Sequence, residues 1–169
     1  EIYTLSLHDA LPIFDYGIIT TIIAKHSPAL SRFILIDPKR VELFQYAELP
    51  HVVNYSTEPA EIENALRLAV NETERRYKDM QQKRLRDYDG CNLYIVIDEL
   101  ADLMIANKKN VLPLLQKIAA IGRAAKVHLI VCTQSVLVEF LPSSIRCKAT
   151  VSHLRPRYVF PFIMNTVAA

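Results

Sequence analysis

The sequence predicts an α/β fold in which helices cover both faces of a parallel sheet. Three observations lead to this prediction. Apolar residues make up 51% of the 169 residues, so the chain can bury a core. Three apolar runs of strand length each end in polar residues, as strands buried on both faces do. Segments with helical periodicity separate these runs, and strands that alternate with helices form parallel sheets.

The N-terminal half contains the first elements of this pattern. Residues 17–25 form a short apolar stretch, which we interpret as the end of a helix that stops before Pro28. Residues 32–36 form an apolar run closed by Asp37, and they predict a buried strand. Residues 49–53 predict another, shorter strand.

A long amphipathic helix is predicted to begin at residues 56–59 and to run to about Arg86. The sequence Ser-Thr-Glu-Pro at its start offers a hydroxyl cap, an acid and a proline for the first turn. Apolar residues then recur on one face of the helix at a spacing of about 3.6 residues. They are Ile62, Ala65, Leu66, Ala69, Val70, Tyr77 and Met80.

The second half repeats the alternation of strands and helices. Residues 93–97 predict the next buried strand, and residues 127–132 predict the last one. Between them, the apolar spacing predicts two helices, over residues 100–106 and 111–125. After residue 141 the pattern weakens, and no element is predicted there.

Polar residues follow the buried strands at the edge where ligands bind in open parallel sheets. They are Asp37, Asp98 with Glu99, and Thr133 with Gln134. A buried strand followed by Asp-Glu is the Walker B pattern of P-loop ATPases. In that chemistry the first acid holds the Mg²⁺ that bridges the phosphates, and the second orients and polarises the attacking water. The alternative is that these acids only cap the helix that follows.

Other polar residues also have two interpretations. Gln134 senses a γ-phosphate or is a polar strand end that faces solvent. Arg123 is a favourable cation at a helix C-terminus, or an arginine finger that reaches the nucleotide of a neighbouring subunit. His128, inside an apolar strand, is interpreted as a core histidine. A basic cluster contacts DNA phosphates or forms a solvated, ion-paired helix face; it comprises Arg75, Arg76, Lys78, Lys83, Arg84 and Arg86.

Composition excludes several classes of protein. Lys and Arg total 20 and Asp and Glu total 18, which excludes a polycation that binds DNA through bulk charge. The three glycines, Gly17, Gly90 and Gly122, do not complete G-x-x-x-x-G-K-[ST], so no phosphate loop is present in the sequence. Three cysteines without a C-x-x-C pair indicate free thiols in a reducing compartment. No apolar run reaches the ~18 residues of a membrane span.

Four segments resemble signatures of one family, the FtsK/SpoIIIE DNA translocases of bacteria. They are residues 33–43 (FILIDPKRVEL), 74–77 (ERRY), 97–104 (IDELADLM) and 122–129 (GRAAKVHL). Their order and approximate spacing also fit, and the resemblance covers residues 18–134. It identifies Asp98 as the acid of the magnesium site, Glu99 as the hydrolytic glutamate, Gln134 as the sensor and Arg123 as the arginine that acts in trans. Lys39 and Arg40 belong to the signature, but no role follows for them.

The resemblance implies a RecA-like P-loop core that uses ATP and Mg²⁺. It further implies a homo-hexamer around double-stranded DNA, with a function in chromosome segregation and cell division. A cytoplasmic motor domain is expected, in a parent protein that is anchored in the bacterial inner membrane at the septum through other regions. The alternatives are a conjugation-type coupling ATPase and a non-catalytic α/β binding module.

The sequence also departs from the family pattern. Residues 1–13 resemble the translation of a sequencing adapter and stand where the Walker A loop is expected. The connection at residues 87–92 is shorter than in the family, and Ser135-Val136 replace an expected Arg-Pro. We therefore expect an artefactual leader over residues 1–13, an incomplete motor domain over 14–150 and an unassigned tail over 151–169. By itself the chain is expected to bind ATP poorly and to be inactive.

Overall fold

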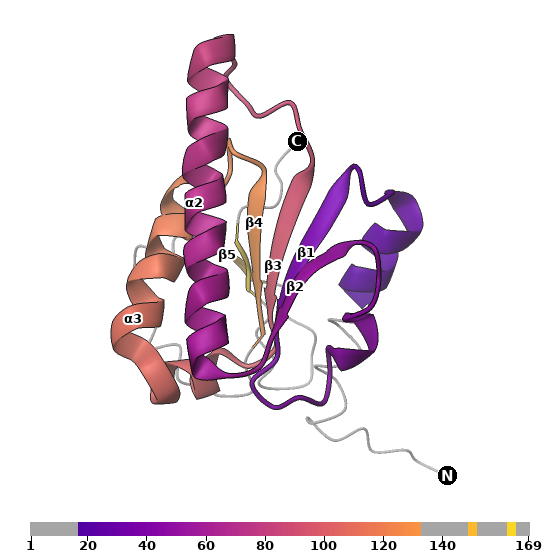
Figure 1. Cartoon of the computed structure of the whole chain (residues 1–169), viewed down its shortest axis with the longest axis vertical. Coiled ribbons are helices and arrows are strands. Elements are labelled where there is room, and N and C mark those ends of the chain that lie inside the picture. Colours follow the sequence, from indigo (N-terminus) through magenta and orange to yellow (C-terminus); the bar gives the residue numbers. More distant parts are fainter. Residues whose placement is uncertain (1–16, 133–148, 152–161, 165–169) are drawn as a thin grey trace.

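A computed structural model describes residues 17–132, 149–151 and 162–164 of the chain. Within them lies a six-stranded sheet of order β2-β1-β3-β4-β6-β5 (Figure 1). Its central strands β2, β1, β3 and β4 are parallel, which confirms the predicted parallel sheet. Two short strands extend it antiparallel beyond β4 and were not predicted. The strands are β1 (Ser31–Ile36), β2 (Val52–Ser56), β3 (Asn92–Ile97), β4 (Val127–Val131), β5 (Ala149–Val151) and β6 (Phe162–Met164).

Helices cover both faces of the sheet, as predicted. Helices α2 (Pro59–Lys83) and α3 (Leu100–Ile121) lie side by side on one face (Figure 1). The opposite face is covered by the helix over residues 17–25, drawn in indigo, and by the short 3₁₀ helix η1 (Phe44–Tyr46). A sheet with two covered faces explains why its central strands are continuous apolar runs.

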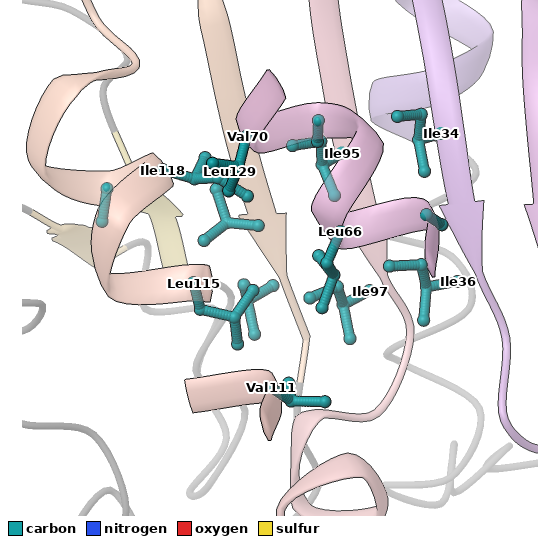
Figure 2. Close-up of a cluster of buried hydrophobic side chains, with 14 of the residues drawn as sticks. Ile34, Ile36, Leu66, Val70, Ile95, Ile97, Val111, Leu115, Ile118 and Leu129 are labelled. Carbon is teal, nitrogen blue, oxygen red and sulfur yellow. The ribbon is translucent and has the colours of Figure 1, made fainter. Parts of the chain in front are cut away.

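The pleat of the strands divides the core between the two faces. Ile34, Ile95 and Leu129 occupy neighbouring positions on β1, β3 and β4, and their side chains point toward α2 and α3 (Figure 2). The intervening residues Phe33 and Val96 pack on the other face against Ile19 and its neighbours. Successive side chains of a strand point to opposite faces, so one apolar run supplies both cores.

The long predicted helix is present, but both of its ends differ from the prediction. Its N-cap residue is Glu58 and not a hydroxyl, and the side chain of Glu61 accepts the backbone N–H of Glu58 at 3.4 Å. The helix ends at Lys83, before the predicted Arg86, because Arg84 takes a left-handed conformation with a φ of 56°. The backbone N–H of Leu85 then returns to the carbonyl oxygen of Met80, which closes the helix.

Helix α3, from Leu100 to Ile121, consists of two helical segments that meet at a kink, which agrees with the two helices predicted there. The kink lies at Asn107, whose φ of −154° and ψ of 45° are not helical. Glu63 of α2 accepts hydrogen bonds from the side-chain amides of Asn107 and Asn110 at 3.0 and 2.9 Å, which ties the kink to the neighbouring helix.

The strand predicted over residues 49–53 begins later than expected. The backbone N–H of Val52 donates to the carbonyl oxygen of Leu49 at 2.9 Å, so residues 49–51 form a turn. Strand β2 therefore starts at Val52 and continues to Ser56. A local apolar pattern indicated the strand but not its pairing with β1, which sets its bounds.

Candidate functional site at the carboxyl edge of the sheet

Acidic residues gather where β1 and β3 end. The backbone N–H of Asp98 donates to the carbonyl oxygen of Ile36 at 3.1 Å, so the residues that follow the two strands are neighbours. The N–H of Cys132 donates in the same way to Ile97 at 2.8 Å, which adds the end of β4. The predicted grouping is confirmed for Asp37, Asp98 and Glu99. Thr133 and Gln134 lie outside the described residues.

Asp98 is the electrostatically unusual residue of this edge. Only 7% of its surface is exposed. Burial, followed by the neighbouring charges of Asp37, Glu42 and Glu99, raises the pKa of its carboxyl group to about 7, although the charge of Lys39 lowers it. A carboxylate in such surroundings is strongly favoured by a cation that binds beside it, so Asp98 suits a metal-dependent role.

Glu99 caps helix α3 in this structure. Its Oε1 accepts the backbone N–H of Ala101 at 3.0 Å, and 3% of the residue is exposed. The helix-cap interpretation is therefore correct for Glu99 as its side chain stands. The other oxygen, Oε2, lies 3.8 Å from Nζ of Lys39, which also lies 3.8 Å from Oδ2 of Asp102. Both oxygens of the predicted hydrolytic glutamate thus have partners in this chain.

Asp37 organises the loop that follows β1. It is fully buried, and its Oδ2 accepts the backbone N–H of Leu43 at 3.0 Å and the hydroxyl of Tyr55 at 3.3 Å. Burial, followed by the charge and hydrogen bond of Asp37, raises the pKa of Tyr55 to about 12. Among the described residues, the second carboxylate oxygen of Asp37 has no hydrogen-bond partner.

Sequence reasoning missed two residues of this edge. Lys39 was noticed in the signature but received no role, although its ammonium group reaches Glu99 and Asp102. Tyr55 was not singled out. Its hydrogen bond with Asp37 depends on the pairing of β2 with β1, and no local pattern reports such a pairing. The position of Lys39 two residues after a strand-end acid was the one available signal.

Arg123 lies at the opposite edge of the sheet. It belongs to the turn between α3 and the start of β4, whereas Asp98 follows the end of β3, and these strands are parallel. The structure therefore does not bring Arg123 together with Asp98 and Glu99 within one chain. Arg123 is exposed, and its side chain has no partner within residues 17–132.

The basic cluster on α2 is mostly ion-paired. Arg75 bonds Glu72 through Nε at 2.7 Å, and Lys83 lies 3.0 Å from Asp79. Arg76 is 2% exposed and points into the protein, so it cannot contact DNA phosphates there. The helix-face interpretation is correct for Arg75 and Lys83. Arg76 has the predicted ion pair with Glu72, at 2.8 Å, but it is buried and not solvated.

The remaining candidates are structural. His128 stacks on the ring of Tyr94, with 4.9 Å between centroids, and its Nε2 lies 3.1 Å from Oδ1 of Asn92. This agrees with a histidine of the core. Cys91 and Cys132 are free thiols, and Cys147 lies outside the described residues. In the part of the chain that the structure describes, no group of three or more His, Cys, Asp or Glu side chains is placed to hold a metal ion.

The architecture is that of the RecA-like P-loop ATPases. The chain superposes on EssC (ATPases 2 and 3) from Geobacillus thermodenitrificans with a TM-score of 0.74, at 13% identity, covering 91% of this chain and 37% of that one. It superposes on the pCW3 conjugation coupling protein TcpA, solved with ATPγS, with a TM-score of 0.70, at 16% identity, covering 83% of this chain and 44% of that one. At these identities the similarity concerns the fold alone.

The chain belongs to the FtsK/SpoIIIE family, whose sequence model matches residues 16–95 and 91–138. It is 37% identical over 150 residues to a DNA translocase FtsK of Staphylococcus epidermidis, and 33% identical over 150 residues to the DNA translocase SpoIIIE of Bacillus subtilis. In both cases the match covers 77% of this chain and 19% of the relative. The chain thus spans about a fifth of the length of these relatives. The two matched ranges overlap at residues 91–95.

Proposed function

We propose that this chain is part of the motor of an ATP-driven double-stranded DNA translocase that acts in chromosome segregation and cell division. One observation carries the proposal. In a chain of the FtsK/SpoIIIE family, Asp98 and Glu99 follow a buried strand at the carboxyl edge of the sheet, beside the buried Asp37. This is where an open parallel sheet binds ligands.

The residues of this edge fit a magnesium nucleotide. Asp98 is a buried acid among other acids, and a buried oxygen of Asp37 lacks a hydrogen-bond partner among the described residues. Mg²⁺ is held in proteins by one or two carboxylates, with water and phosphate oxygens completing its shell, so a cluster of three protein ligands is not needed. When bound, Mg²⁺ neutralises charge that develops on the phosphates. In this proposal Asp98 holds the ion, which binds with ATP.

Glu99 is the proposed general base that orients and polarises the attacking water. For this, its side chain leaves the cap of α3 and the ion pair with Lys39, both of which occupy it in the present structure. Gln134, which follows β4 in the sequence and lies outside the described residues, is the proposed sensor of the γ-phosphate. A carboxylate positioned in this way contributes about 10²–10⁴-fold to a hydrolysis rate.

Arg123 is the proposed arginine finger. Its position at the opposite edge from Asp98 supports action on a neighbouring subunit, because a residue there cannot reach the nucleotide of its own chain. A closed ring of identical subunits repeats one heterologous contact, so every subunit would supply Arg123 to the next. We propose a homo-hexamer that encircles the duplex.

The motor is proposed to lie on the cytoplasmic side, with membrane attachment through regions other than the described residues. In these residues no helix is long and apolar enough to cross a membrane. We assign residues 14–150 to the motor, leave 151–169 unassigned and interpret 1–13 as foreign. Since the sequence lacks G-x-x-x-x-G-K-[ST], this chain alone is expected to show no Mg²⁺-dependent ATP turnover; measurable turnover by the purified chain would contradict this.

The decisive experiment compares two isosteric variants of the full-length protein. Glu99→Gln is expected to bind ATP with unchanged affinity and to lose DNA-stimulated turnover by about 100-fold or more. Glu48→Gln, on an exposed residue, is the matched control and is expected to behave as the unmodified protein. A Glu99→Gln protein that retains its turnover would show that Glu99 is not the general base, and an unmodified protein without turnover would favour the non-catalytic binding module.

A conjugation-type coupling ATPase is the second candidate, supported by the fold shared with TcpA. Translocation of duplex DNA by the full-length protein does not distinguish the two, but localisation does. A fluorescent fusion at the division septum would support the proposed role in segregation, and recruitment only to a conjugation apparatus would support the alternative.

A further inference from the structure

The turn that carries Arg123 has no free backbone carbonyl. Six consecutive carbonyl oxygens, from Ile121 to Lys126, each accept a hydrogen bond. Three of the donors are backbone N–H groups outside the turn itself: Val127 to Gly122 at 2.9 Å, Tyr88 to Ala124 at 2.8 Å and Leu93 to Lys126 at 2.9 Å. A surface turn ordinarily leaves several carbonyls to water, so this one is unusually constrained.

Two side chains of α2 donate further hydrogen bonds to the carbonyl oxygens of this turn. The hydroxyl of Tyr77 donates to the carbonyl oxygen of Ile121 at 2.7 Å. Nη1 of Arg76 donates to the carbonyl oxygens of Ala125 at 2.9 Å and Lys126 at 3.2 Å. Both residues belong to the ERRY segment, to which the proposed reaction assigns no task. Hydrogen bonds from a buried guanidinium are among the stronger ones in proteins.

Arg76 also fixes the segment that leads into β3. The same Nη1 reaches the carbonyl oxygen of Cys91 at 2.8 Å, and the ring of Tyr88 lies under the guanidinium at 4.6 Å. Its Nε is balanced by Glu72 at 2.8 Å, so the buried charge has a counter-ion. One side chain therefore joins α2, the connection before β3 and the Arg123 turn.

The backbone of the turn has little room to move. A Cβ on Gly122 would lie 2.5 Å from the carbonyl oxygen of Val127 and 2.7 Å from that of Ile118. Lys126 holds a left-handed conformation with a φ of 53°, which costs a non-glycine residue about 1 kcal/mol. In contrast, the side chain of Arg123 is exposed and has no partner within residues 17–132.

We infer that Arg76 and Tyr77 are positioning residues for Arg123: they hold the turn so that its one unpaired cation is presented to the adjoining subunit. The inference rests on the proposed trans role of Arg123. An arginine displaced by about 1 Å loses much of its effect on a transition state. The hydrogen bonds that Arg76 and Tyr77 donate to the turn therefore have a functional consequence beyond stability.

The test uses mixed oligomers of the full-length protein. Arg76→Lys keeps the charge but loses the planar fork, and Tyr77→Phe loses only the hydroxyl. Each is expected to bind ATP with unchanged affinity, because the nucleotide edge is at the other end of the strands, and to lose about tenfold or more of its DNA-stimulated turnover. Arg67→Lys, an exposed arginine earlier on α2, is the matched control and is expected to retain turnover.

Each variant is then mixed with inactive Glu99→Gln subunits, which still carry a correctly held Arg123. The mixture is expected to regain turnover severalfold above the sum of its two components, as is a calibrating mixture of Arg123→Ala with Glu99→Gln. A residue that only stabilises the fold of its own chain would not be rescued in this way.

The outcomes are distinguishable. If the Arg123→Ala mixture does not recover, the trans role is wrong and the inference is overturned with it. If that mixture recovers and the Arg76→Lys and Tyr77→Phe mixtures do not, only the positioning inference is overturned. Full turnover by both variants alone would also overturn it. Tyr77→Phe keeps the test valid if Arg76→Lys does not fold.

Discussion

Nζ of Lys39 lies 3.8 Å from Oε2 of Glu99, so a lysine that follows strand β1 is ion-paired with the glutamate that follows strand β3. The same ammonium group is equally close to Asp102 in the first turn of α3. The pairing is possible because β1 and β3 are in parallel register and end together. Lys39 thereby offsets part of the negative charge that Asp37, Asp98 and Glu99 bring to this edge.

Removal of this charge is expected to affect Asp98 directly. The charge of Lys39 lowers the pKa of Asp98 against the effect of burial, so Lys39→Met should raise that pKa further above about 7. Lys39→Arg, which keeps the charge, is the control and should leave the pKa nearly unchanged. The carboxyl ¹³C shift of Asp98, followed by NMR as a function of pH, measures both. An unchanged pKa in Lys39→Met would show that Lys39 does not act on this site.

Asp98 is also expected to make stability depend on pH. Its pKa is raised from 3.8 to about 7, so the folded protein retains a proton that the unfolded chain has lost. The free energy of unfolding should therefore fall as the pH rises from about 4 to about 7, and the loss should be complete above that range. Asp98→Asn should remove this fall and stabilise the chain above about pH 7 by up to about 4 kcal/mol.

Urea denaturation across that pH range measures the effect. Asp87→Asn, at an exposed position, is the control and should reproduce the profile of the unmodified chain. The prediction fails if Asp98→Asn and the unmodified chain lose stability in parallel as the pH rises.

Gly122 is expected to tolerate no side chain. A Cβ there would meet two backbone carbonyl oxygens, at 2.5 and 2.7 Å, that belong to β4 and α3 and cannot rotate away. Gly122→Ala should lower the free energy of unfolding by about 1–3 kcal/mol. Gly17→Ala is the matched control, because no heavy atom lies within 4 Å of its Cβ position. Helix propensity should make that variant more stable by about 0.5–1 kcal/mol. Equal melting temperatures for the two variants would contradict the constraint on the turn.

Helix α2 offers a matched pair of leucines that tests the core. Leu66 is fully buried between the helix and the sheet, whereas Leu68 is 59% exposed (Figure 2 shows Leu66). Leu66→Ala should lower the free energy of unfolding by about 2–5 kcal/mol, because it leaves a cavity. Leu68→Ala should change it by about 0.5 kcal/mol or less. Comparable losses would mean that the helix does not pack as described.

Much of the site could be predicted because its geometry follows from local patterns. The strand that ends at Ile97 is recognised by its apolar run, and Asp98 follows it directly. Parallel pairing then places the end of β1 beside it, so Asp37 and Asp98 become neighbours without any knowledge of side-chain contacts. The roles of Asp98, Glu99, Gln134 and Arg123 stay predictions.

Other features could not be predicted because they depend on long-range contacts. Arg76 and Arg75 are adjacent and chemically identical in the sequence, yet Arg76 is buried and Arg75 is exposed. The difference arises because only one of the two faces the carbonyl oxygens of Ala125 and Lys126, about fifty residues away.

The sequence by itself determined the parallel strands of the sheet, the amphipathic helix and the acids at the strand ends, because hydrophobic periodicity and strand polarity are properties of neighbouring residues. Tertiary structure alone decided the partners of the charged side chains: Lys39 with Glu99, Tyr55 with Asp37, and Arg76 with the Arg123 turn. The physical reason is that a buried charge or hydroxyl requires a partner, and the partner that it finds depends on which segments the fold brings within about 3 Å.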